Sequence, residues 1–319
     1  KIYELANILD CNSDIVMNCV MNLLDRGIII ARKKCEIVDI KIYGKYGCFY
    51  PKEMIVELTS RCNFMCPFCY KNALKKGKDI KWEHMENIVN LISTNVRYIQ
   101  LTGGEPTLHP EFEKIVKLFP NDVILSMVTN GSLLYEKDLF TLKRFSEIQI
   151  SLYGTSDAEY LCNTGMTDGY SKLVRSIAVM HDNNIGFSIS VTLHKNNIED
   201  LEKYIICAID LGARVLKVGA ADLFGREKNI SALDDEYMKK KSELDSEILR
   251  LKRKYYSHIK ILLNNIEIEE KKDEKKEKLL MKNLPCGSGV DYLVVSQDGN
   301  IRPCLYFSEN EMDIGKLEQ

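Results

Sequence analysis

Residues 61–70 read RCNFMCPFCY and place Cys62, Cys66 and Cys69 in the spacing C-x3-C-x2-C. Three thiolates can ligate only three irons of a four-iron, four-sulfur cube, so the fourth iron keeps an open position for a ligand that is not protein. The spacing therefore predicts a [4Fe-4S] cluster with an open iron site, held by these three cysteines and reactive at the fourth iron.

A structural zinc site is the alternative, because C-x2-C pairs also bind zinc. Zinc knuckles pair two such hooks or add histidines, whereas the nearest Cys or His after Cys69 is His84. A second motif, Gly103-Gly104-Glu105-Pro106, follows the strand-like residues 98–102. Two adjacent glycines allow close approach of the backbone to a ligand, which favours the cluster over zinc.

Together these two motifs resemble the radical S-adenosylmethionine (SAM) superfamily. In that family the open iron takes the amino and carboxylate groups of SAM, and the reduced cluster breaks the sulfonium bond to give a 5'-deoxyadenosyl radical that abstracts a substrate hydrogen. The resemblance implies that Phe68 lies beside the adenine and that residues 103–106 bind the SAM amino group. It implies that Ser151 faces the ribose or carboxylate and that Ser190 and Thr192 contact the sugar.

Strand-length apolar runs alternate with segments of helical spacing between residues 53 and 225. The runs are residues 55–58, 98–102, 123–129, 148–152, 187–193 and 215–218. Repeated strand-helix units predict an α/β fold with parallel strands and right-handed crossovers. Six units make three quarters of an eightfold barrel, which is the partial (β/α)6 TIM-like barrel of the resembling superfamily.

The candidate site residues follow the predicted strands, and barrel active sites gather at the carboxyl ends of strands. The cysteine run follows the first strand, the Gly-Gly-Glu-Pro motif ends the second, and Asn130 and Ser151 end the third and fourth. The expected cofactor-binding residues are Phe68, Gly103, Gly104, Glu105, Pro106, Asn130, Ser151 and Thr192. The alternative for each polar member is a turn or strand residue with no ligand.

Residues 1–45 show two helix-spaced segments followed by two short strands, as in a winged helix. Residues 1–41 contain six Lys or Arg and six Asp or Glu, so the basic footprint of a nucleic-acid binder is absent. The segment resembles the peptide-recognition modules that accompany radical SAM enzymes and bind a leader peptide by strand addition. An inert packing domain is the alternative.

Near the end of the chain, Cys286 and Cys304 flank a run with Asp298-Gly299 as a hairpin turn. This stretch resembles the opening of the SPASM or twitch extension, which holds auxiliary iron-sulfur clusters, and the resemblance implies that both cysteines are ligands. The later cysteines of a SPASM domain are not in this chain, so we expect a truncated extension at residues 285–319. A buried, non-ligating cysteine pair is the alternative.

Between the expected barrel, residues 46–225, and that extension lies a charged stretch. Residues 226–284 carry charges of both signs, which predicts solvated helices that bridge two domains. One more strand is possible at residues 259–263.

The overall composition gives no sign of a nucleic-acid or membrane partner. The 319 residues include 44 basic and 46 acidic side chains, for a formal net charge of -2. No apolar run reaches the ~18 to 20 residues that span a bilayer, and no signal peptide is recognisable. Eleven cysteines without a secretory signal suit a reducing compartment, so we expect a soluble cytoplasmic protein.

The two flanking modules resemble those of peptide maturases that install thioether or carbon-carbon crosslinks. We therefore expect an enzyme that cleaves SAM and modifies a ribosomally made precursor peptide. Its partners would be that peptide, through its leader, and a one-electron donor such as flavodoxin or ferredoxin. The alternatives are a radical SAM enzyme of another substrate type, such as a side-chain maturase, an epimerase or a small-molecule enzyme, and a zinc-containing winged-helix regulator.

Overall fold

The computed structural model describes residues 50–221, 226, 235–263, 287–307 and 312–317, and six residues near the start. The chain divides into two compact units, residues 1–42 and 43–319. In the first unit the described residues, which are 13, 14, 16, 17, 20 and 21, are helical, and Val16 is buried. The rest of the predicted winged-helix module and Cys286 lie outside the described residues.

The described part of the second unit contains one ten-stranded sheet with the order β10-β9-β8-β1-β2-β3-β4-β5-β6-β7. The strands are β1 (Glu53–Glu57), β2 (Tyr98–Thr102), β3 (Ile124–Thr129), β4 (Glu147–Ser151), β5 (Ser188–Leu193), β6 (Val215–Ala220), β7 (Lys260–Leu263), β8 (Tyr292–Val295), β9 (Asn300–Arg302) and β10 (Gly315–Lys316). All pairs from β8 through β1 to β7 are parallel, whereas β8–β9 and β9–β10 are antiparallel.

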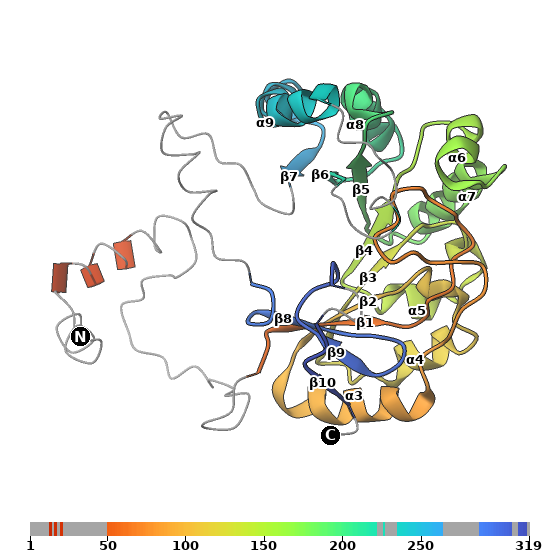
Figure 1. Cartoon of the computed structure of the whole chain (residues 1–319), viewed down its shortest axis with the longest axis vertical. Helices are drawn as coiled ribbons and strands as arrows, with labels where there is room; N and C mark the ends of the chain where they lie inside the picture. Colours follow the sequence, from red (N-terminus) through yellow and green to blue (C-terminus); the bar gives the residue numbers. More distant parts are fainter. Residues whose placement is uncertain are drawn as a thin grey trace. The chain divides into compact units, whose positions relative to one another are not determined.

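Helices connect the parallel strands and lie along the outer side of the curved sheet (Figure 1). They are α3 (Trp82–Asn95), α4 (Phe112–Leu118), α5 (Leu139–Lys143), α6 (Asp157–Thr164), α7 (Gly169–Asp182), α8 (Leu201–Asp210) and α9 (Asp235–Tyr255), with short 3-10 turns η1 (Pro106–Leu108), η2 (Leu134–Glu136) and η3 (Ile198–Asp200). The predicted α/β class with parallel strands is confirmed, and the six predicted strands all form. The architecture is compatible with a partial barrel.

The two faces of the sheet differ in chemistry because side chains alternate along each strand. Leu101, Met127 and Ile150 are fully buried under the helices. Gln100, Ser126 and Gln149, which adjoin these residues along the strands, point to the other face, where Gln100 pairs in register with Ser126. Ser190 and Lys217 of the next two strands are also paired in register and lie on that same face. The inner face of the curved sheet is therefore polar, and it ends at the site described below.

Residues 226–284 were expected to form solvated helices that bridge two domains. The described part of this stretch instead packs against the second unit. Helix α9 buries Tyr237, Leu244, Ile248 and Leu251 and leads into β7, which pairs with β6. These four residues form one narrow apolar stripe on a helix whose other positions are mostly charged. The many charged residues led the sequence analysis to predict a solvated helix. The expected hairpin at Asp298-Gly299 is present as β8–β9, and β8 extends the parallel sheet beside β1. None of the described helices has the length and apolar character of a membrane span.

Candidate active site

A cavity of about 150 Å³ lies at the carboxyl ends of β1 to β5. The expected site residues that line it are Cys62, Cys66, Phe68, Cys69, Gly103, Gly104, Asn130, Ser151 and Thr192. These residues come from five separate strand ends, and the parallel order of the sheet brings them together. The cavity is therefore the candidate active site.

The cysteine loop begins just after β1 and folds back on itself. The Cys62 N–H donates to the Leu74 carbonyl at 2.8 Å, and the Cys69 N–H donates to the Cys66 carbonyl at 3.2 Å. Cys62 and Cys66 are buried, whereas Cys69 is partly exposed. The fold thus presents three thiols from one short loop to one cavity.

The electrostatic environment of these thiols disfavours free thiolates. Burial, and then the nearby Glu105 carboxyl, raises the pKa of Cys62 to about 12. Burial also raises the pKa of Cys66, and both Cys62 and Cys69 raise it further. Because each thiolate would repel the others, the loop needs a bound positive group to deprotonate all three.

The donor set fits an iron-sulfur cluster better than a single ion. Among the residues that the structure describes, no three His, Cys, Asp or Glu side chains converge closely enough to hold one metal ion. A four-iron cluster takes its thiolates at separate corners and supplies the positive charge that these buried thiols need. Cys62, Cys66 and Cys69 therefore fit the three-cysteine cluster of the sequence prediction.

The sequence predicted that the two glycines after β2 allow the backbone to approach a ligand closely. In the structure, the atoms closest to a Cβ at either position are backbone atoms of Thr59 and Arg61. A Cβ on Gly104 would lie 2.2 Å from the Arg61 carbonyl oxygen, and one on Gly103 would lie 2.5 Å from the Thr59 carbonyl oxygen. The Gly104 N–H donates to the Thr59 carbonyl at 2.7 Å. Glycine is thus required here to seat the loop after β2 directly against the start of the cysteine loop.

Glu105 and Pro106 lie behind the cavity wall and do not line the cavity. The buried Glu105 carboxylate accepts hydrogen bonds from Thr107 Oγ1 at 2.6 Å, Thr129 Oγ1 at 2.7 Å and the Asn130 N–H at 2.7 Å. Burial raises the pKa of Glu105, and these bonds partly offset that effect. Pro106 begins η1. Both residues fix the loops that form the wall.

Asn130 links the end of β3 to the cysteine loop. Its Nδ2 lies 3.9 Å from Cys62 Sγ and donates to Asn63 Oδ1 at 2.9 Å. Its Oδ1 accepts from Ser132. Ser151 ends β4 and lies in register with Ser190 of β5, so the predicted sugar contacts lie on one wall of the cavity.

Sequence reasoning missed His194, which follows β5 directly. Its ring stacks on Phe68 with ring centroids 4.7 Å apart and an angle of 24°. Tyr153 also stacks on Phe68, at 6.1 Å. Burial lowers the pKa of His194 to about 4, so the ring is neutral at neutral pH. The signal was available, because a polar residue at the carboxyl end of a barrel strand is a site candidate.

Cys304, expected as an auxiliary ligand, is buried after β9. The Tyr292 hydroxyl donates to its sulfur at 3.5 Å. Gly299 has a φ of +81° in the hairpin turn, as the Asp-Gly prediction requires. Sequence reasoning also missed two charged residues, Glu57 and Lys71, that connect this hairpin to the cavity.

Comparisons with known proteins find a family match for part of the chain. Residues 56–206 match the family model described as the radical SAM superfamily. The "antilisterial bacteriocin subtilosin biosynthesis protein AlbA" of Bacillus subtilis (strain 168) is 24% identical over 278 residues, which cover 84% of this chain and 57% of that protein. The "PqqA peptide cyclase" of Ruegeria pomeroyi is 27% identical over 181 residues, 55% of this chain and 48% of that protein. This chain spans about half the length of these two relatives.

A third relative is matched over most of its length. The "probable GTP 3',8-cyclase" of Saccharolobus islandicus is 26% identical over 279 residues, 82% of this chain and 85% of that protein. The three relatives thus differ in the substrates that their names print.

Two solved structures share the fold. The crystal structure of Streptococcus suis SuiB bound to precursor peptide SuiA has a TM-score of 0.66 at 13% identity and covers 96% of this chain and 76% of that one. Native anSMEcpe with bound AdoMet has a TM-score of 0.67 at 18% identity and covers 84% and 78%. Residues 56–206 thus match a radical SAM domain, and the residues that line the three-cysteine cavity lie within that match.

Proposed function

We propose that the chain is a radical SAM enzyme that modifies a ribosomally made precursor peptide. The observation that carries the first part is the cavity where Cys62, Cys66 and Cys69 meet the loops that end β2 to β5. The radical SAM family implies a [4Fe-4S] cluster and SAM for such a site. With both bound, the cluster and SAM would supply the radical chemistry that removes a hydrogen atom from the substrate.

The residues of the chain then have distinct roles. Cys62, Cys66 and Cys69 hold the cluster, and the wall formed by Gly103 and Gly104 shapes the space for SAM. The proposed SAM contacts are Phe68, Asn130, Ser151 and Thr192, which line the same cavity. The buried rings of Phe64 and Tyr160, together with the partly buried ring of Tyr153, pack around the cysteine loop and would exclude water from the site.

The test of this chemistry is SAM cleavage by the anaerobically reconstituted protein. The reduced wild type should form 5'-deoxyadenosine, and a Cys62→Ala, Cys66→Ala, Cys69→Ala triple variant should form none. Cys207→Ala is the matched control, because Cys207 is also buried but lies on α8 outside the cavity. Zinc in place of iron, or equal SAM cleavage by the triple variant, would contradict the proposal.

The peptide substrate is proposed from the two flanking modules and from the relatives. The printed names of two relatives concern subtilosin and the PqqA peptide, and SuiB was solved with a precursor peptide. Residues 1–45 would bind the leader as an added strand. Residues 285–319 would begin a SPASM or twitch extension, with Cys286 and Cys304 as auxiliary-cluster ligands.

Crosslink formation would give an auxiliary cluster a chemical role. Joining two groups of the peptide removes two hydrogen equivalents. One would leave as a hydrogen atom taken up in forming 5'-deoxyadenosine. The other would leave as a proton and an electron, and an auxiliary cluster held by Cys286 and Cys304 would be the electron acceptor. Flavodoxin or ferredoxin would supply the electron that starts each turnover. We place the enzyme in the cytoplasm, where donor and precursor are available.

Deletion of residues 1–42, the first compact unit, tests the peptide assignment. A leader-dependent enzyme should lose peptide modification and keep SAM cleavage. Peptide turnover at the wild-type rate after the deletion would exclude leader recognition by this unit. A small-molecule substrate is the second candidate, since the GTP cyclase relative is matched over 85% of its length. It predicts product from GTP without any peptide.

A further inference from the structure

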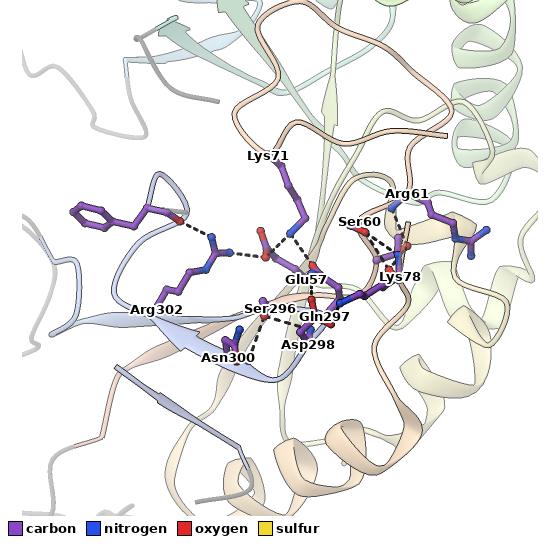
Figure 2. Close-up of polar contacts among 12 residues, drawn as sticks. Glu57, Ser60, Arg61, Lys71, Lys78, Ser296, Gln297, Asp298, Asn300 and Arg302 are labelled. Carbon is purple, nitrogen blue, oxygen red and sulfur yellow. Dashed lines mark hydrogen bonds and ion pairs between the residues drawn. The ribbon is translucent and has the colours of Figure 1, made fainter. Parts of the chain in front are cut away.

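We propose that the C-terminal hairpin β8–β9 sets the charge beside the cluster site through a buried triad of Glu57, Lys71 and Arg302. The inference rests on the proposed radical SAM function and concerns control of the same site. The triad joins three segments that are far apart in sequence: the end of β1, the cysteine loop and the end of β9 (Figure 2).

Glu57 is the centre of the triad. Its side chain is fully buried, and its Oε2 atom lies 2.5 Å from Lys71 Nζ and 2.5 Å from Arg302 Nη2. The Lys71 side chain is 10% exposed and that of Arg302 is 5% exposed. Both ion pairs are therefore shielded from solvent. Charges in the protein interior interact much more strongly than charges at a surface.

The hairpin holds Lys71 by a second contact. Lys71 Nζ donates to Gln297 Oε1 at 2.9 Å, and Gln297 precedes the Asp298-Gly299 turn. Arg302 in turn donates to the Phe307 carbonyl, which anchors its guanidinium within the hairpin region. Lys71 is thus held by β1 on one side and by the hairpin on the other, two residues after Cys69 (Figure 2).

The triad carries a surplus of positive charge. One carboxylate is shared by two cations, and the second oxygen of Glu57 has no hydrogen-bond partner among the described residues. Lys71 lines the cavity that the three cysteines line. One positive charge of the triad is therefore not neutralised within it, and its cavity-lining member places that charge beside the cluster site.

A surplus positive charge favours the reduced cluster. Reduction adds one electron to a group that already carries three thiolates, and cluster potentials depend on net charge and on surrounding hydrogen bonds. Lys71 and Arg302 should therefore raise the reduction potential of the cluster. Arg302 and Gln297 act as positioning residues, so this effect requires a docked hairpin.

The test is a redox titration followed by electron paramagnetic resonance, using the signal that changes when SAM is added. Arg302→Gln and Lys71→Gln each remove one positive charge and should lower the midpoint potential. Glu57→Gln removes the negative charge and should raise it. We expect at least a tenfold change in the reduction equilibrium for each, which is about 59 mV for one electron.

Two controls separate charge from structure. Lys52→Gln breaks the pair with Asp291, which also joins the β1 segment to the β8 segment but is exposed, at 80% and 49% of the two side chains. Its potential should match the wild type. Arg302→Lys keeps the positive charge but cannot contact both Glu57 and the Phe307 carbonyl as the guanidinium does. Its midpoint potential should therefore lie closer to that of the wild type than to that of Arg302→Gln. If Arg302→Gln does not fold, Arg302→Lys and Glu57→Gln carry the test.

The outcomes distinguish this inference from the proposed function. A wild type with no SAM-sensitive cluster signal would overturn both. A normal signal whose potential is the same in wild type, Arg302→Gln and Glu57→Gln would overturn the charge-triad inference alone. An equal shift in Lys52→Gln would also overturn it, because the effect would then not depend on burial.

Discussion

The Glu105 carboxylate accepts the backbone N–H of Asn130 at 2.7 Å and so fastens the loop after β2 to the loop after β3. Asn130 in turn lies against Cys62, with Nδ2 3.9 Å from the sulfur. The Gly-Gly-Glu-Pro motif therefore acts on the cluster site from behind, through the cavity wall. This supporting role does not require Glu105 to touch the cofactor.

Glu105→Gln should destabilise the domain by about 1 to 3 kcal/mol, because an amide NH2 would face hydrogen-bond donors in a buried site. SAM affinity should fall with it, since Asn130 loses its anchor. Unfolding by denaturant and SAM binding measure the two effects. Glu111→Gln, which breaks a surface pair with Lys114, should change stability by less than about 0.5 kcal/mol. Equal effects of the two substitutions would contradict this role for Glu105.

Gly104→Ala should prevent normal assembly of the cysteine loop. The added Cβ would lie 2.2 Å from the Arg61 carbonyl, which belongs to the backbone and cannot swing aside. We expect a loss of about 3 kcal/mol or more and loss of iron after reconstitution. Gly186→Ala is the matched control, since its Cβ would meet nothing within 4 Å. A stable, iron-loaded Gly104→Ala protein would show that the close approach is dispensable.

His194 should make the domain sensitive to acid. Burial places its pKa near 4, below the ordinary value of 6.5. The stability that it contributes is complete above pH 6.5 and is lost as the pH falls through 4, by up to roughly 3 kcal/mol.

Unfolding measured from pH 7 to pH 4 checks this contribution. A His194→Gln variant should lose less stability than the wild type over that range. The exposed His258 provides the control His258→Gln, which should follow the wild type. Parallel curves for the wild type and His194→Gln would contradict the buried, neutral ring.

The apo protein should show unequal thiol reactivity. Cys62 has a pKa of about 12 and Cys66 a raised pKa, and both are buried, whereas Cys162 on α6 is exposed. Iodoacetamide at pH 7.5 should therefore modify Cys162 before Cys62 and Cys66, because the thiolate is the reacting form. Peptide mass mapping over time gives the order. Faster labelling of Cys62 than of Cys162 would mean that the loop is not packed as described.

The strands and the site were predictable from local patterns. Apolar runs located all six strands of the alternating region, and β2 has the predicted bounds, residues 98–102. Polar residues that follow those strands meet in one cavity because parallel strands end at the same edge. Local spacing and one topological rule were sufficient for these features.

Long-range packing was not predictable in the same way. Glu57 and Arg302 are 245 residues apart, and nothing in either neighbourhood indicates that they form a buried ion pair. The burial of one face of helix α9 was also not predicted, because most of its residues are charged. The need for glycine at positions 103 and 104 was recognised, but only the structure shows that the Thr59–Arg61 backbone imposes it.

The most direct measurement of the central claim is the electron paramagnetic resonance spectrum of the reduced, reconstituted protein with and without SAM. We expect a [4Fe-4S] signal that changes when SAM is added, because three cysteines leave the fourth iron open. The Cys62→Ala, Cys66→Ala, Cys69→Ala triple variant should lack that SAM-sensitive signal. A wild-type signal that is absent, or that stays the same with saturating SAM, would contradict the claim that this cavity is a radical SAM site.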